Sequence, residues 1–126
     1  MVKKDFYELT NPQKNIYLRE EYYPNTSINN ISFTYYFEKD LNPEICVKAI
    51  NKIIESNDAL RIRIKKDGNN VFQYISQYCY EEIPIFNCVN KTLIEKKQEM
   101  EIDAKKIFKF EDNKLYKFAI YKLEKN

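Results

Sequence analysis

The chain has 126 residues, 44% of them hydrophobic and 32% charged, which is typical of one folded globular domain. The 21 basic and 19 acidic residues are interspersed and leave a net charge of +2, so the sequence lacks the clustered basic surface that nucleic-acid-binding proteins use. The single glycine and four prolines argue against long flexible linkers, and no run reaches the roughly 20 apolar residues of a membrane-spanning helix.

The cysteine and histidine content restricts the chemistry further. Cys46, Cys79 and Cys88 lack the C-x-x-C spacing of zinc and redox sites, and without any histidine the common mixed Cys/His metal sites are excluded. Cys46 lies on an apolar helix face, where we expect it to fill the core. The start at Met1–Asp5 lacks the apolar stretch of a secretory signal, so we expect reduced thiols and a cytoplasmic protein.

The first helix is predicted by its N-terminal cap. Thr10 and Gln13 have the spacing of a capping box, and Pro12 falls in the first turn, where its missing N–H costs nothing. The helix is expected to run to about Glu21, with Ile16 and Tyr17 facing inward. Residues 1–8 fit either a short strand or an irregular leader.

A turn at residues 23–27 precedes a predicted strand, Ile31–Phe37. Apolar side chains alternate along it and place one set on a single face: Ile31, Phe33, Tyr35 and Phe37. The eleven tyrosines of the chain lack neighbouring clusters of Lys and Arg, so sheet packing is favoured over stacking on nucleobases.

The second helix has the strongest start signal in the chain, with Asn42 as N-cap and Pro43 at the first helical position. Its apolar residues recur at helical spacing and predict a broad stripe facing the core. The stripe consists of Ile45, Cys46, Ala49, Ile50, Ile53 and Ile54.

A strand with two different faces follows this helix. Leu60, Ile62 and Ile64 alternate with Arg61, Arg63 and Lys65, which predicts one apolar and one cationic face. Gly68 then supplies the positive φ needed to reverse the chain, so residues 60–75 are predicted to form a hairpin.

Three more elements complete the chain. Ile83–Phe86 is expected to be a short edge strand, because Pro84 cannot donate to a ladder. Apolar residues spaced three and four apart predict a long helix from Leu93 to Phe108, and Leu115–Leu123 alternates as a strand does.

Three stretches carry a resemblance to a known family. Asp58-Ala59-Leu60-Arg61, after an amphipathic helix, is similar to the second core motif of nonribosomal peptide synthetase condensation domains, usually Arg-His-Glu-x-Leu-Arg-Thr, although Ser56, Asn57 and Ile62 depart from it. Leu9–Leu18 resembles the opening motif of the family, and residues 108–123 resemble the segment that precedes its catalytic His-His-x-x-x-Asp-Gly loop. The resemblance spans nearly the whole chain.

The resemblance implies a fold and a parent function. The fold would be α/β, a mixed sheet with packed helices, similar to the N-terminal lobe of the chloramphenicol-acetyltransferase-like fold, with residues 1–126 forming a truncated lobe. The parent would form amide bonds between acyl or peptidyl and aminoacyl thioesters, delivered on phosphopantetheine by carrier proteins, with no directly bound cofactor and no metal. Its catalytic histidine is expected after Asn126, so the isolated chain should be inactive. Arg61 would support the active site by pairing with the Asp of the catalytic loop; the alternative is a solvated strand arginine.

Other catalytic arrangements are disfavoured. Ser27, Ser32, Ser56 and Ser76 have no histidine partner, and one glycine cannot form a phosphate loop. The acidic pairs Glu81–Glu82 and Glu111–Asp112 are expected to be solvated.

Two alternatives to the condensation function remain open. The chain could be part of an epimerisation domain or free-standing acyltransferase of the same fold. It could instead be a non-catalytic half-domain that binds carrier proteins or a partner chain. For the condensation function, the expected partners are carrier proteins and the missing C-terminal lobe of the same domain, not nucleic acid or a membrane. We expect an exposed sheet edge to favour self-association.

Overall fold

The computed structural model describes residues 5–39 and 41–123, and their order of elements alternates strands and helices. The elements are β1 (Tyr7–Glu8), α1 (Asn11–Tyr22), α2 (Pro43–Ser56), the 3₁₀ turn η1 (Asp58–Arg61), β2 (Ile62–Asp67), β3 (Asn70–Ile75), β4 (Ile85–Asn87), α3 (Leu93–Ala104) and β5 (Ile120–Lys122).

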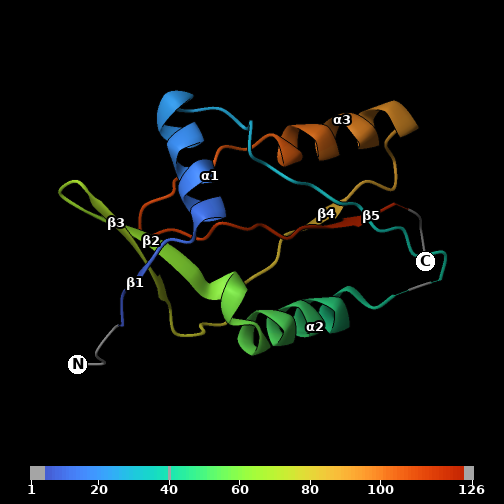
Figure 1. Ribbon diagram of the computed structural model, residues 1–126. Coiled ribbons are helices and arrows are strands. Elements are labelled where there is room, and N and C mark those ends of the chain that lie inside the picture. The colour runs from blue at the N-terminus through green and yellow to red at the C-terminus, as the bar shows by residue number, and fades with distance from the viewer. Residues whose placement is uncertain (1–4, 40, 124–126) are drawn as a thin grey trace.

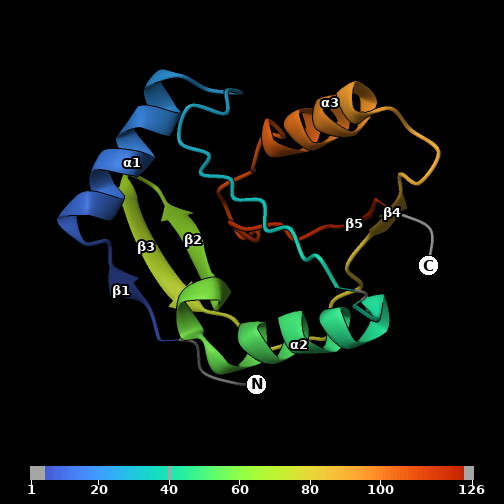
Figure 2. The same cartoon turned by 90° about the vertical axis from the view of Figure 1, so that its right-hand side faces the viewer.

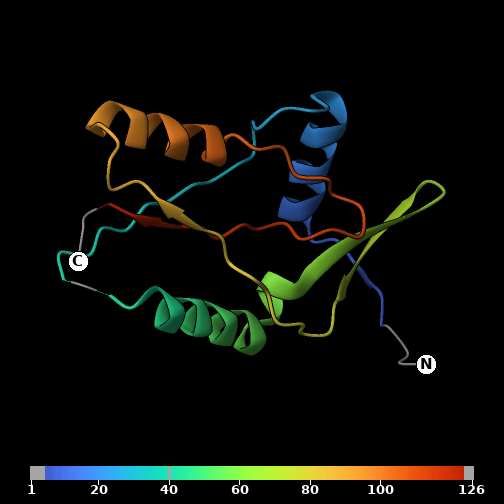
Figure 3. The same cartoon turned by 180° about the vertical axis from the view of Figure 1, so that it is seen from behind.

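Two small sheets form the frame of the molecule. β1, β3 and β2 make an antiparallel sheet in that order, and β4 pairs with β5 in parallel. α1 lies beside the first sheet, while α2 and α3 lie on opposite sides of the β4–β5 region (Figures 1, 2 and 3). A parallel bridge between Ile64 and Glu111 connects the first sheet to the segment that leads to β5. The expected α/β class, with both antiparallel and parallel pairing, is confirmed.

One glutamine both caps α1 and attaches it to the sheet. The predicted capping box is present, and Gln13 Oε1 accepts a hydrogen bond from the Thr10 amide at 2.8 Å. Gln13 Nε2 donates to Gln73 Oε1 at 2.7 Å, and Gln73 Nε2 donates back to Gln13 Oε1 at 3.0 Å. The predicted inward orientation of Ile16 is wrong, because its side chain is 46% exposed and the contact with β3 is made by the polar Gln13 instead.

The start of α2 is confirmed, but half of its apolar stripe is exposed. Asn42 Oδ1 accepts from the amides of Glu44 and Ile45 at 2.8 and 3.4 Å. Ile54 is 1% exposed, whereas Ile45 and Ile53 remain 64% and 49% exposed. The stripe therefore marks the buried face only in part, since Ile54 is buried and Cys46 and Ile50 are partly buried.

The predicted hairpin is confirmed, with a later start. β2 and β3 pair from Ile62↔Ile75 to Asp67↔Asn70, and Gly68 has a φ of +58°. Leu60 and Arg61 belong to η1 and not to the strand, because the chain makes one 3₁₀ turn directly after α2.

The predicted strand Ile31–Phe37 is wrong. In the described part of the chain these residues pair with no strand, and their side chains are exposed, as for Ile31 (81%), Phe33 (75%) and Tyr35 (79%). Alternating apolar residues form part of a sheet only where a neighbouring strand pairs with them and another layer covers their apolar face. Residues 5–39 and 41–123 provide neither for this segment. The segment is instead held at its start, where Asn30 Nδ2 donates to the carbonyl oxygens of Ala104 and Lys106 at 2.9 and 2.8 Å.

The C-terminal elements are shorter than predicted. α3 ends at Ala104, not near Phe108, because the Asn30 side chain takes up carbonyl groups at its end. β4 begins after Pro84, and β5 is limited to the three residues that pair with it. Flanking bonds from Ile120 N to Pro84 O (2.9 Å) and from Cys88 N to Lys122 O (2.8 Å) extend this contact.

The apolar core among the described residues is small. Its buried members are Leu9, Ile54, Ile64, Tyr74, Ile83 and Cys88. α1 and α3 contain no buried residue, so neither helix is held by apolar burial alone. Cys46 is only partly buried, contrary to its expected role as core filler.

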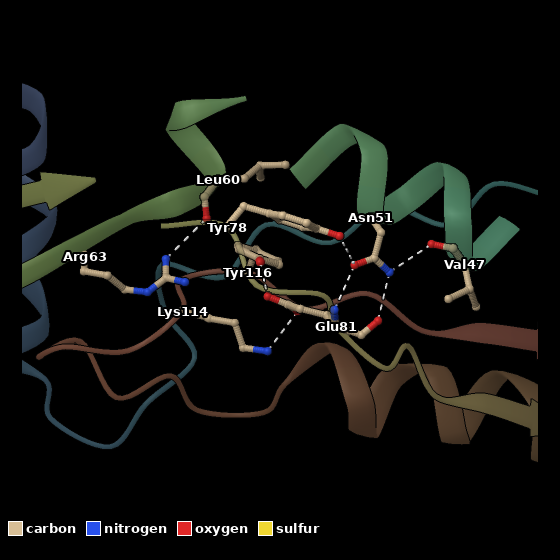
Figure 4. A network of polar contacts seen from close by, with 8 residues as sticks. All are labelled: Val47, Asn51, Leu60, Arg63, Tyr78, Glu81, Lys114 and Tyr116. Atoms are coloured by element: carbon tan, nitrogen blue, oxygen red, sulfur yellow. Dashed lines mark hydrogen bonds and ion pairs between the residues drawn. The ribbon is translucent and has the colours of Figure 1, made fainter. Parts of the chain in front are cut away.

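A buried amide joins α2 to residues 78–81. Asn51 is 3% exposed, and Figure 4 shows its side chain between α2 and Glu81. Its Nδ2 donates to the carbonyl oxygens of Val47 and Glu81 at 3.0 and 2.8 Å, and its Oδ1 accepts from the Glu81 amide and the Tyr78 hydroxyl at 2.8 and 3.1 Å. Both donors and both acceptor positions of the amide are used.

A carboxylate joins α3 to the segment that forms β5. Asp103, whose side chain is 14% exposed, binds Lys106 at 2.8 Å, Lys117, and the Tyr121 hydroxyl at 3.0 Å. Burial opposes ionisation of this carboxyl group, but the hydrogen bonds from Lys106, Lys117 and Tyr121 outweigh it and lower its pKa to about 2.

Asp103 therefore makes stability depend on pH. Because its pKa is lower in the folded chain than the ordinary 3.8, its contribution of about 2 kcal/mol is present above pH 4 and is lost as the pH falls toward 2. Asp103→Asn should lower the free energy of unfolding near pH 6 and flatten its fall between pH 4 and 2, as measured by urea denaturation. Asp67→Asn, at the exposed end of β2, is the control and should keep the wild-type pH profile. An unchanged profile in Asp103→Asn would contradict the assignment.

The Asn51 amide should be among the most sensitive single positions in the fold. Asn51→Leu keeps the volume but leaves the Glu81 amide and carbonyl groups buried without partners, so we expect a loss of about 2–4 kcal/mol in the free energy of unfolding. Tyr78→Phe removes one of the four bonds and should cost about 1 kcal/mol. Chemical denaturation measures both, and equal small losses would show that the amide is not a cross-link.

Candidate functional site

A hollow of about 380 Å³ lies where the predicted family motif meets the rest of the chain. It is formed by the end of α2, the start of β2, residues 76–82 and residues 114–116. Figure 4 shows that side chains from these separate segments converge there. Arginine, lysine, tyrosine and glutamate side chains line it, so its chemistry is mainly polar.

Arg61, the residue assigned a supporting role by resemblance, lies at the end of η1 and lines this hollow. Its guanidinium pairs with Asp58 and its Nη1 donates to Ser76 O at 3.3 Å. Its Nε is buried and has no hydrogen-bond partner in the described part of the chain. The Arg61 side chain is 17% exposed, so the solvated alternative does not describe it, while its role toward a catalytic loop stays a prediction.

Arg63 is buried, although the sequence placed it on a cationic strand face together with Arg61 and Lys65. It is 9% exposed, and its Nη1 donates to the carbonyl oxygens of Leu60 and Ile62 at 3.3 and 2.8 Å. Strand alternation assigns a residue to a face but cannot show what covers that face. Here that face borders a hollow that residues 76–82, Lys114 and Tyr116 also line.

Glu81 is a member of the site, and its predicted solvation is wrong. Its side chain is 16% exposed and accepts hydrogen bonds from the Tyr116 hydroxyl and from Lys114 Nζ, the latter at 2.9 Å (Figure 4). Burial raises the pKa of Tyr116, and its hydrogen bond to the Glu81 carboxylate raises it further. Glu82 is exposed, as predicted.

The second acidic pair remains exposed, but Asp112 also connects two segments of the chain. Asp112 has a φ of +54°, and its carboxylate accepts from Lys65 Nζ and the Tyr74 hydroxyl at 2.8 Å each. Its amide donates to Ile64 O at 2.8 Å, so the residue attaches this turn to β2. Glu111 is exposed. The solvation predicted for both acids is confirmed, since the side chains of Glu111 and Asp112 are 56% and 43% exposed.

The residues of this site are suited to binding and positioning other groups. Among the described residues no group of three His, Cys, Asp or Glu side chains could hold a metal ion. Cys79 lines the hollow and is a free thiol, as are Cys46 and Cys88, and burial raises the pKa of Cys88. The sequence contains no histidine, so it offers no imidazole to transfer protons near neutral pH.

Within residues 5–39 and 41–123, no helix has the length and hydropathy to cross a membrane.

The sequence prediction missed the structural roles of two residues of this region, although each has a sequence feature that could have indicated its role. Asn51 is a polar residue at the i+4 position from Val47 and interrupts the apolar stripe of α2, which is unusual for a helix face that packs on a core. Arg63 stands between Ile62 and Ile64, where a cation in an apolar neighbourhood needs a partner.

Comparison with known sequences identifies the family. The sequence model of the family described as "Condensation domain" matches residues 3–126. Surfactin synthase subunit 1 of Bacillus subtilis (strain 168) is 41% identical over 76 residues, which cover 58% of this chain and 2% of that protein. A plipastatin synthase subunit of the same organism is 26% identical over 120 residues, 94% of this chain and 5% of that protein. The chain thus spans a small part of the relatives it matches.

Comparison of folds agrees with this assignment. The starter condensation domain of rhizomide synthetase RzmA superposes with a TM-score of 0.86 at 20% sequence identity, covering 95% of this chain and 31% of that chain. A mutant of the same domain in complex with C8-CoA gives a TM-score of 0.85 and covers 94% of this chain and 28% of that one. The family predicted from the three sequence motifs is confirmed. The chain belongs to the condensation-domain family of nonribosomal peptide synthetases and corresponds to part of one such domain.

Proposed function

We propose that this chain is the N-terminal part of a condensation domain that joins an upstream acyl or peptidyl thioester to the amine of a downstream aminoacyl thioester. The observation that carries the proposal is the match of residues 3–126 to the family, together with coverage of less than a third of the similar solved domains. Both thioesters would arrive on phosphopantetheine arms of carrier proteins, in the cytoplasm. The chain would form one wall of the passage between them.

The side of the passage formed by this chain would position reacting groups and would not transfer protons. The hollow offers guanidinium, ammonium and phenol groups held by neighbouring acids, and the sequence contains no histidine. The base that receives the proton of the attacking amine would therefore come from outside residues 1–126, in keeping with the family motif expected after Asn126. Arg61 would support that loop through a carboxylate.

The uncovered apolar surface supports a larger assembly. Ile31, Phe33 and Phe37 are 70% to 81% exposed, and Leu93 and Ile102 of α3 are 69% and 67% exposed. Single soluble chains rarely leave so many large side chains in water, since contiguous apolar patches mark contact surfaces. The missing lobe of the same domain is the partner we propose for them; self-association of the isolated chain stays an expectation.

A non-catalytic half-domain that binds carrier proteins is the second candidate, favoured by the complete absence of histidine. Part of an epimerisation domain or of a free-standing acyltransferase of the same fold is a further alternative. The reading frame beyond codon 126 separates these candidates. A stop codon supports the half-domain, and continuation into a His-His-x-x-x-Asp-Gly loop supports the condensation function. The form of the histidine motif distinguishes the condensation function from the other enzymes of the same fold.

The isolated chain should form no amide with loaded carrier proteins at any pH, because it has no catalytic histidine. A gene product that continues through the rest of the domain should form it, as measured by mass spectrometry of the product released from the carrier protein. That longer product with its motif histidine replaced by alanine is the control for background aminolysis. Turnover by residues 1–126 alone, or none by the longer product, would refute the proposal.

Arg61→Ala should change the free energy of unfolding of this chain by less than about 1 kcal/mol, because its acid partner Asp58 is 66% exposed. In the longer product the same change would leave a buried carboxylate unpaired and should cost about 3–5 kcal/mol and abolish activity. Lys52→Ala, which breaks the exposed pair with Glu55, is the control in both chains. Equal small losses in the two chains would show that Arg61 has no supporting role.

A further inference from the structure

Arg63 is a buried cation without an acid of its own. None of the described carboxylates lies within 4.0 Å of its guanidinium, whereas Arg61, Lys65 and Lys114 each have one. Its hydrogen-bond partners are two backbone carbonyl oxygens, both bound through Nη1. Burying a charge is costly unless an opposite charge compensates it, so a side chain that is 9% exposed should have such a partner.

Arg63 borders the hollow, where such a partner could enter. The other cations of the lining are already engaged, Arg61 with Asp58 and Lys114 with Glu81. Glu82 is also part of the lining and is exposed. Among the described residues, Arg63 is thus the one cation of the lining that has no ion-pair partner.

The chemistry of the site favours a carboxylate. A guanidinium has five N–H donors, and Nη1 carries both carbonyl contacts of Arg63. Donors on Nε and Nη2 form the planar pair of donors that matches two carboxylate oxygens. A hollow of about 380 Å³ accommodates a side chain and its flanking backbone.

We propose that the hollow at Arg63 is a carboxylate-binding site, filled in the complete domain by an Asp or Glu side chain from outside residues 1–126. The identity of the occupant rests on the proposed function, because it requires the remainder of a condensation domain. The chain covers 28% to 31% of the similar solved domains, so most of such a domain lies outside it. This role is separate from the one proposed for Arg61, which already pairs with Asp58 within the chain and would in addition support the catalytic loop.

The site can be tested on the 126-residue chain with acetate as the probe. Sodium acetate should raise the melting temperature above that in sodium chloride of equal ionic strength at pH 7, by about 4 °C at ten times its dissociation constant. Arg63→Met should abolish the difference, and Arg63→Lys, which keeps the charge but loses the planar pair of donors, should reduce it. Lys65→Met, on the same strand face but paired with Asp112 outside the hollow, should retain it.

Three results would overturn the carboxylate assignment. They are an equal acetate effect in wild type and in both Arg63 variants, no acetate effect in wild type, and an equal effect of inorganic phosphate, which would indicate an unselective anion site. If Arg63→Met does not fold, the comparison of Arg63→Lys with wild type decides.

The occupant is tested with the longer gene product. There the acetate effect should disappear because the site is filled, and Arg63→Met should lower the melting temperature more than it does in the 126-residue chain. A longer product that forms amide but still responds to acetate would refute the internal occupant while leaving the proposed function intact. A longer product that forms no amide but has lost the acetate response would refute only the proposed function.

Discussion

Buried polar cross-links hold this chain together in place of a continuous apolar core. Asn51 attaches α2 to the segment that contains Glu81, and Glu81 attaches that segment to Tyr116. Asp103 does the same for α3 and the segment leading to β5. In each case one side chain joins two segments that are well separated in sequence. Such networks specify geometry only when every member has its partners, since a half-satisfied network costs more than an apolar contact.

The features that sequence predicted well are those decided within a few residues. The cap at Asn42, the capping box of Thr10 with Gln13, and the left-handed Gly68 depend on local backbone geometry, and all three are present. The family motif at Leu60–Arg61 was also recognisable, because a motif is a local pattern. The fold class was expected from the family resemblance of such motifs, together with the order of strands and helices.

The predictions that were wrong concern which segments of the chain cover a given residue. Ile31–Phe37 has the alternation of a strand, yet an alternating pattern does not supply the neighbouring strand. Arg63 and Glu81 were assigned to solvent because charged residues are usually exposed, and the segments that bury them come from distant parts of the chain. The early end of α3 has the same origin, because the residue that takes up its terminal carbonyl groups is Asn30. A candidate site built from several distant segments is therefore the part of the molecule that sequence alone describes least well.

The contact between Asn30 and the end of α3 has a consequence for the order of folding. It joins residues separated by 74 and 76 positions, and closing a loop of that length costs about 4 kcal/mol in chain entropy. Two hydrogen bonds return about 1–3 kcal/mol, so this contact cannot nucleate the fold. Helix α1, the β2–β3 hairpin and α3 rely on short-range contacts and would form first, and Asn30 would dock late, after the chain between them has already become compact. The beginning of the exposed segment 31–37 is thus set by one of the last steps of folding, and that segment would stay accessible to a partner while the rest of the chain is assembling.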